Sequence, residues 1–316
     1  MELFLFNHQE YERLYNCTNL VIDSIPIENR RLTIEAIINL ILGIIYFLVY
    51  LPCLYSIWKQ HWKNDCYTIL LYIGIVDLVG IIISGFLHPI LSLQGAVFCS
   101  YPTLIYIVGT FVFGLLRLVL IWNAYLYLAI ILYFICPILH VFVNPVLFSG
   151  IYFAWFFYPF VGYREDYGEF VFDQLPSYHD VSVAILSPLI YLIFAIALVI
   201  KSKKSIITPN QAPTQYFSIS RLEKMVFLQV FSLSLLNTTE CLFYIIMQYT
   251  TQQKWMTILA EFLWFHIHGF PPIIYLTLNK TIREDCLILL KKLKNINKDP
   301  PSNVVNVMVT PFNANS

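Results

Sequence analysis

Seven long apolar runs constrain this chain more than any other feature of its sequence. Each run is about 20–25 residues long, and a helix of about 20 residues crosses a hydrocarbon core of roughly 30 Å. Backbone amides in lipid must be satisfied within the segment, so we expect helices. The chain is 59% hydrophobic and 12% charged, which favours an all-α membrane protein, a bundle of seven transmembrane helices. The predicted spans cover residues 34–57, 67–87, 101–120, 124–148, 181–200, 225–249 and 255–278.

The third and fourth runs decide the number of spans. Residues 101–148 are almost continuously apolar, and as one helix they would extend about 72 Å at roughly 1.5 Å per residue. One crossing cannot accommodate that length. We therefore expect two crossings joined by an unusually short turn near residues 121–123, which gives seven spans rather than six.

Basic residues indicate the orientation, because cytoplasmic segments are enriched in Lys and Arg. Seven spans with the N-terminus outside place 13 basic residues inside and 5 outside. Six spans with the N-terminus inside give 14 and 4, so charge alone does not settle the number. The sequon at Asn16, an N-glycosylation acceptor usable only on the lumenal side, favours an outside N-terminus.

The spans divide the chain into an extracellular segment, a transmembrane domain, an amphipathic cytoplasmic eighth helix on the membrane lipids and a disordered tail. Their predicted limits are residues 1–33, 34–278, 279–298 and 299–316. The aromatic run at residues 153–158, in the longest outer loop, has two interpretations. It is either a belt at the membrane interface or a lid over an outward-facing pocket.

Three carboxyl groups lie within predicted spans, namely Asp77, Glu240 and Glu261. Ionisable groups in a span are costly and usually face the bundle interior. We expect these three to form a ligand-binding site or polar core. The alternative is that each is neutralised by protonation or by a neighbouring polar group.

Other features exclude several classes of function. His266 and His268 lie two positions apart, so on a helix they point to different faces, and no metal or cofactor is expected. No zinc-protease helix motif, nucleophile elbow or glycine-rich phosphate loop occurs, so the chain is not expected to be an enzyme. The formal net charge is zero, which gives no basic field for nucleic acid.

Cys17 and Cys99 are the two cysteines that this topology places outside. The outer compartment is oxidising, so these two residues are a candidate disulfide. The alternative is a pair of free thiols.

The sequence resembles the nematode chemosensory receptors, most closely the serpentine receptor class T family, which is related to rhodopsin-like G-protein-coupled receptors. The resemblance is carried by Tyr15-Asn16-Cys17, Asp65-Cys66-Tyr67, Gly74-Ile75-Val76-Asp77, Cys99-Ser100-Tyr101-Pro102 and the stretch from His268 to Arg283. In the last of these, Pro272-Ile273-Ile274-Tyr275 matches the Pro-x-x-Tyr core of the seventh-helix activation switch, with Pro271 in place of the usual Asn or Asp. Proline removes a helix hydrogen bond, so Pro271 and Pro272 predict a kink about which Tyr275 moves.

The resemblance implies a chemosensory receptor that binds a small-molecule ligand and signals through a heterotrimeric G protein. It implies a place in the plasma membrane or the sensory cilium of chemosensory neurons. The sequence departs from the family at the inner end of the third span, where Arg117 lacks the acidic or amide neighbour and the polar loop that should follow. A signalling-deficient receptor variant is therefore an alternative, and so is an ion or solute transporter or channel.

Overall fold

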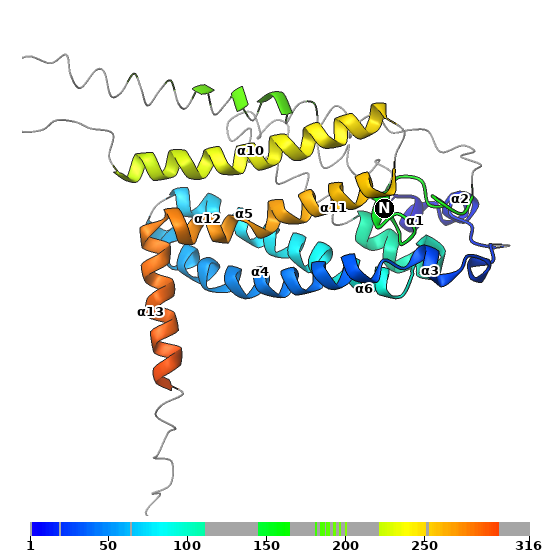
Figure 1. Cartoon of the computed structure of the whole chain (residues 1–316), viewed down its shortest axis with the longest axis horizontal. Coiled ribbons are helices and arrows are strands. Elements are labelled where there is room, and N and C mark those ends of the chain that lie inside the picture. Colours follow the sequence, from blue (N-terminus) through cyan, green and yellow to red (C-terminus); the bar gives the residue numbers. More distant parts are fainter. Residues whose placement is uncertain are drawn as a thin grey trace, which may run out of the picture.

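The structure is a computed structural model that describes residues 2–18, 20–63, 65–110, 145–164, 221–250 and 253–296, with scattered positions between 181 and 200. Within these residues the chain is helical apart from loops and one small hairpin. The long helices run side by side along the long axis of the molecule, and a last helix stands across one end (Figure 1).

The N-terminal segment forms short helices at the opposite end of the bundle (Figure 1). The side-chain carbonyl of Asn7 accepts the N–H of Glu10 at 3.3 Å, which caps the second of these helices. The elements are α1 (Glu2–Phe6), α2 (His8–Leu14), a 3₁₀ turn (Ile22–Ser24) and α3 (Ile27–Arg30).

The first two predicted spans pair closely along their length. The first is α4 (Thr33–Gln60), which continues into a 3₁₀ turn (His61–Lys63). The second runs through α5 (Asp65–Ile82), a π-helical turn (Ile83–Leu87) and α6 (His88–Leu93), and so extends beyond the predicted end at residue 87. A Cβ atom on Gly43 would lie 2.6 Å from the Gly85 carbonyl oxygen, so the two backbones meet there because neither residue has a side chain.

The sixth and seventh predicted spans lie on the other side of the bundle. The sixth is α10 (Arg221–Tyr249), and the seventh is broken into α11 (Lys254–Gly269) and α12 (Pro271–Leu278). Helix α13 (Lys280–Ile296) follows and contacts both α12 and the end of α4. It is nearly perpendicular to the bundle (Figure 1).

The predicted limit of the fourth span is wrong at its last residues. The third span is helical where it is described, over residues 102–110, after a 3₁₀ turn at Phe98–Ser100. Strand β1 (Leu147–Ser149), however, occupies the place where the fourth helix was expected to end. It pairs antiparallel with β2 (Ala154–Phe156). Hydropathy does not distinguish a helix end from a β-strand at these residues, because a short apolar run buried inside protein is compatible with either. The turn at 121–123 and the tail at 299–316 lie outside the described residues.

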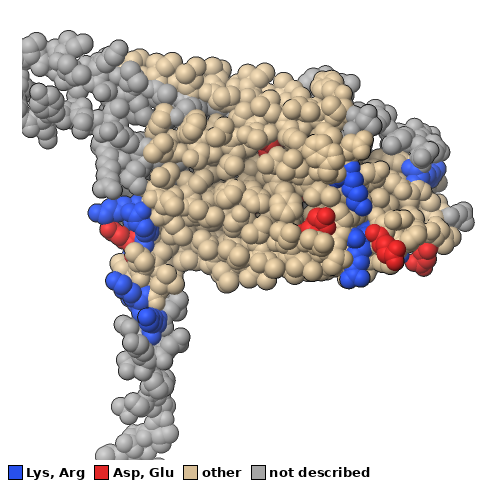
Figure 2. Space-filling view, in the orientation of Figure 1, with Lys and Arg blue, Asp and Glu red and all other residues tan. Residues whose placement is uncertain are grey.

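The outer surface of the long helices is apolar. On α4, Ile34, Ile41 and Leu48 are 72%, 53% and 61% exposed, and they recur along one face. Two helices of the described part, Ile27–Gln60 and Leu70–Leu93, are long and apolar enough to cross a membrane, and Phe231–Met247 is a shorter apolar helix. Figure 2 shows Lys and Arg gathered near the two ends, with few charges on the long surface between them. A lipid-facing bundle accounts for this pattern.

Candidate functional site

Asp77 joins three helices at the centre of the bundle. Its Oδ2 accepts the Tyr50 hydroxyl at 2.7 Å, and its Oδ1 lies 2.9 Å from Nδ1 of His268. Tyr50 belongs to α4, Asp77 to α5 and His268 to α11, and all three side chains are buried. We call this set the Asp77 lock. A buried carboxyl group is tolerated because both of its oxygens have partners here.

Gly80 makes room for the lock. It lies one helical turn after Asp77, and a Cβ atom there would be 2.6 Å from the His268 ring. The ring therefore reaches the carboxylate across a position that has no side chain. Sequence reasoning did not assign His268 or Tyr50 to this site, since nothing local marks a partner 191 or 27 residues away.

A second polar cluster lies under the β1–β2 hairpin and consists of His88, Trp155 and Glu261. The backbone N–H of Trp155 donates to Glu261 Oε1 at 3.3 Å, and its indole N–H donates to His88 Nδ1 at 3.2 Å. His88 Nδ1 lies 3.6 Å from Glu261 Oε2. All three residues are at most 9% exposed. We call this set the hairpin cluster.

The predicted carboxyl site is therefore divided between two places. Glu240, half-buried on α10, lies within electrostatic range of Glu261. Asp77 instead belongs to the separate lock, where its partners are a histidine and a tyrosine. His266, the other histidine near the end of α11, is bonded to the Phe262 carbonyl oxygen at 2.6 Å. Among the described residues no three His, Cys, Asp or Glu side chains converge as metal ligands.

Most of the aromatic run of the outer loop is buried, while Phe156 and Phe157 are half-buried. Phe153 is fully buried, and its ring centroid lies 4.2 Å from that of His88. The hydroxyl of Thr257 on α11 donates to the Tyr152 carbonyl oxygen at 2.8 Å, which ties the hairpin turn to the seventh span. These contacts pack the hairpin against the helices of the bundle.

The predicted switch residues follow His268 of the lock along the chain. Because Pro271 and Pro272 have no N–H, the carbonyl oxygens of Ile267 and His268 cannot accept their usual helical bonds, and α11 ends at Gly269. Tyr275, one turn into α12, is fully buried. Its hydroxyl lies beside that of Tyr50, which itself donates to Asp77.

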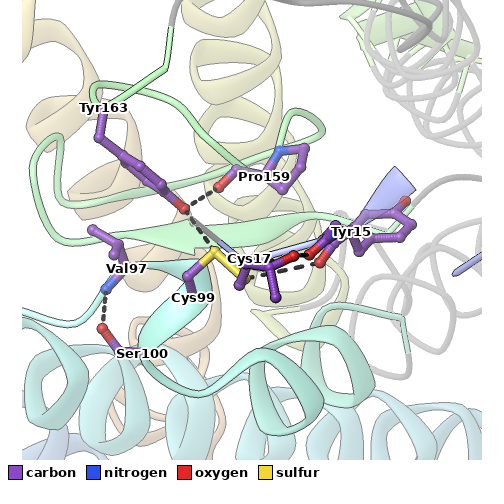
Figure 3. Close-up of a disulfide and its surroundings, with 9 residues drawn as sticks. Tyr15, Cys17, Val97, Cys99, Ser100, Pro159 and Tyr163 are labelled. Carbon is purple, nitrogen blue, oxygen red and sulfur yellow. Dashed lines mark hydrogen bonds between the residues drawn. A yellow bond between two sulfur atoms is a disulfide. The ribbon is translucent and has the colours of Figure 1, made fainter. Parts of the chain in front are cut away.

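Cys17 and Cys99 are joined by a disulfide, with 5.6 Å between their Cα atoms (Figure 3). The bond links the N-terminal segment to the start of the third span. The rings of Tyr11 and Tyr15 pack against Tyr106 with centroids 4.9 and 5.1 Å away, so the N-terminal segment covers this end of the bundle. Asn16 beside the disulfide is exposed.

Asp285 holds α13 to the end of α4. Its carboxylate accepts hydrogen bonds from Ser56 Oγ at 3.0 Å, Lys59 Nζ at 2.8 Å and Gln60 Nε2 at 3.0 Å. Partial burial by itself would raise the pKa of Asp285, but the three donors outweigh it and hold that pKa below its ordinary value. We call this contact the Asp285 clamp.

The comparisons with known proteins point to one family. The model of the family described as "Serpentine type 7TM GPCR chemoreceptor Srt" matches residues 1–119 and 117–299. No curated protein and no solved structure matches the chain significantly. The family match covers nearly the whole chain and agrees with the long apolar helices of the structure. The chain is an integral membrane protein and belongs to the Srt family of serpentine seven-transmembrane chemoreceptors.

Proposed function

We propose that this chemoreceptor binds a small ligand at the end that carries the disulfide and releases a heterotrimeric G protein at the end that carries α13. The first end would lie outside, since disulfides form in oxidising compartments and the exposed Asn16 sequon would be glycosylated there. The receptor would act in the plasma membrane or the sensory cilium of chemosensory neurons.

The orientation is supported by the chemistry of α13. This helix places Lys280, Lys291, Lys292 and Lys294 on an exposed surface and leaves Leu287, Ile288 and Leu290 at least half exposed. A basic helix with exposed apolar side chains fits the interface of an anionic inner leaflet. Its direction across the end of the bundle (Figure 1) suits a helix lying along a membrane surface.

The observation that carries the proposal is the Tyr275 hydroxyl. It is fully buried beside the Tyr50 hydroxyl, which already donates to Asp77, so a turn of α12 would move it relative to the lock. The Asp77 lock lies beside the Tyr275 hydroxyl. Along the chain, the Pro271–Pro272 break separates His268 of the lock from Tyr275. We infer that ligand binding loosens the lock and lets α12 turn about the break, so that Tyr275 changes partners.

The proposal is tested in cells that report G-protein release in response to a library of volatile and water-soluble compounds. A responding compound should lose most of its effect in Tyr275→Phe and in Asp77→Asn at unchanged surface expression. Tyr55→Phe is the matched control, because Tyr55 lies on α4 but is 49% exposed. Equal responses from Tyr275→Phe and Tyr55→Phe would refute the switch. A compound-driven current without G-protein release would favour a channel or transporter.

A second candidate function is a signalling-deficient variant of such a receptor. The family match falls into two stretches that meet at residues 117–119, beside the place where the sequence lacks the expected polar loop. A chain missing that inner loop would still bind its ligand while coupling poorly. Inserting a family-type loop of about 20–30 residues after Arg117 should then raise G-protein release without changing ligand affinity. An unchanged response in the restored chain would exclude this alternative.

A further inference from the structure

The hairpin cluster contains two buried polar atoms without hydrogen-bond partners among the described residues. They are Oε2 of Glu261 and Nε2 of His88. The two side chains are 5% and 0% exposed, so bulk water does not complete their bonding. Buried polar groups are almost always paired, so the open Oε2 acceptor of Glu261 indicates a place for a hydrogen-bond donor.

The contacts of Trp155 fix the protonation of His88. An indole N–H only donates, so His88 Nδ1 must be an acceptor while Trp155 bonds to it at 3.2 Å. Nδ1 then carries no proton to share with Glu261 Oε2, 3.6 Å away. In this arrangement His88 is not a cationic partner for the carboxyl group, and among the described residues Glu261 keeps only the hydrogen bond from the backbone N–H of Trp155.

Two basic side chains near this end, Lys254 and Arg30, are engaged elsewhere. Lys254 Nζ lies 3.5 Å from the Asn29 carbonyl oxygen, and Arg30 bonds the Gly95 carbonyl oxygen at 3.3 Å and Asp23 at 3.4 Å. Glu240 adds a second carboxyl group within electrostatic range of Glu261. Among the described residues Glu261 forms no ion pair with a Lys or Arg side chain.

Aromatic rings pack around the cluster, and such rings suit a cation with an apolar body. The rings of Phe148 and Phe153 lie 4.9 and 4.2 Å from His88, and Phe148 lies 5.4 Å from Trp155. Aromatic faces attract ammonium groups as well as hydrocarbon. Phe153 also has a left-handed backbone conformation, φ 53°, which is strained for a bulky residue. Movement of the hairpin would relieve that strain.

We propose that Glu261 binds the protonated amino group of a small amine. The ammonium group donates a hydrogen bond to Oε2 and a second one to Oε1, where it replaces the backbone N–H of Trp155. Loss of that Trp155 bond lets the β1–β2 hairpin move. The ammonium supplies the counter-charge that the cluster lacks, and the aromatic rings take the hydrocarbon part. This inference rests on the proposed function, because it names the ligand class of that receptor.

The test measures direct binding to the purified full chain in detergent, without G protein. The probes are butylamine, hexylamine and 2-phenylethylamine, each compared with the alcohol that has the same carbon skeleton. At least one amine should bind wild type tenfold or more tightly than its alcohol. Glu261→Gln should lose that difference and retain alcohol binding. Glu12→Gln, a matched change of an exposed acid, should keep it.

Amine and alcohol binding of equal strength, no amine binding at all, or full amine affinity in Glu261→Gln would each overturn the proposal. If Glu261→Gln does not fold, the amine–alcohol comparison on wild type decides alone. The result is separable from the proposed function. Amine binding without G-protein release would overturn the signalling role only, whereas release by a neutral compound with no amine binding would overturn the ligand class only.

Discussion

Asp285 is the side chain that holds α13 to α4, and its replacement by alanine should free this helix. The carboxylate pairs with Ser56, Lys59 and Gln60, and Ser56 is fully buried whereas Lys59 is half exposed. After Asp285→Ala, the exposed donors turn to water, but the Ser56 hydroxyl is left unpaired at a cost of about 1–3 kcal/mol. Opening of α13 should become more favourable by roughly 5- to 150-fold.

Hydrogen exchange of the α13 amides in the reconstituted protein measures this change. Glu284→Ala is the matched control, because Glu284 is the neighbouring acid on the same helix and its ion pair with Lys280, at 3.6 Å, joins two exposed side chains. Such a pair contributes about 0–1 kcal/mol. Faster exchange confined to Asp285→Ala is the expected result. Equal exchange in the two variants would refute the clamp.

Three further predictions concern the lock, the disulfide and the clamp. Gly80→Ala should destabilise the protein by about 1–3 kcal/mol in thermal melting, because the new methyl group meets the histidine ring of the lock. Gly74→Ala should cost less, because its new methyl group would lie 2.7 Å from the flexible end of Leu54 and no closer than 3.3 Å to the Tyr50 ring; equal losses would contradict this account. Replacing Cys17 and Cys99 with serine should cost about 2–5 kcal/mol and abolish the effect of reductant on melting, and a persistent effect would exclude this disulfide as its source. Because the folded pKa of Asp285 is lowered, the clamp should be complete above the unfolded pKa of about 3.9 and be lost as pH falls through the folded value, as measured by spin-label distances to α13; release near pH 6 would contradict it.

The sequence predicted the helical spans well where long apolar runs meet no competing structure. Helix α4 covers the predicted range 34–57 with one added residue at its start and three at its end, since no charged residue interrupts the run between Glu35 and Lys59. The break at Phe270 was also predictable, because two consecutive prolines remove two helical hydrogen bonds whatever the surroundings.

The partners within the site were not predictable. Asp77 was singled out because a carboxyl group in a span is conspicuous, but its bond to His268 joins residues 191 positions apart. Glu261 was found in the same way, whereas His88 and Trp155 look like ordinary members of apolar or aromatic segments. Their roles depend on the hairpin, and residues 147–148 have the composition of a transmembrane helix end. Only tertiary packing decides between those outcomes.

The most direct test of the receptor account is G-protein nucleotide exchange by the purified chain reconstituted in lipid vesicles with a heterotrimeric G protein. The account predicts that a compound that binds at the disulfide end accelerates exchange, and that Tyr275→Phe abolishes the acceleration while Tyr55→Phe preserves it. Acceleration of equal size in wild type and Tyr275→Phe would contradict the proposed switch. Ligand binding without any acceleration, even in a chain with the inner loop restored, would contradict the signalling role.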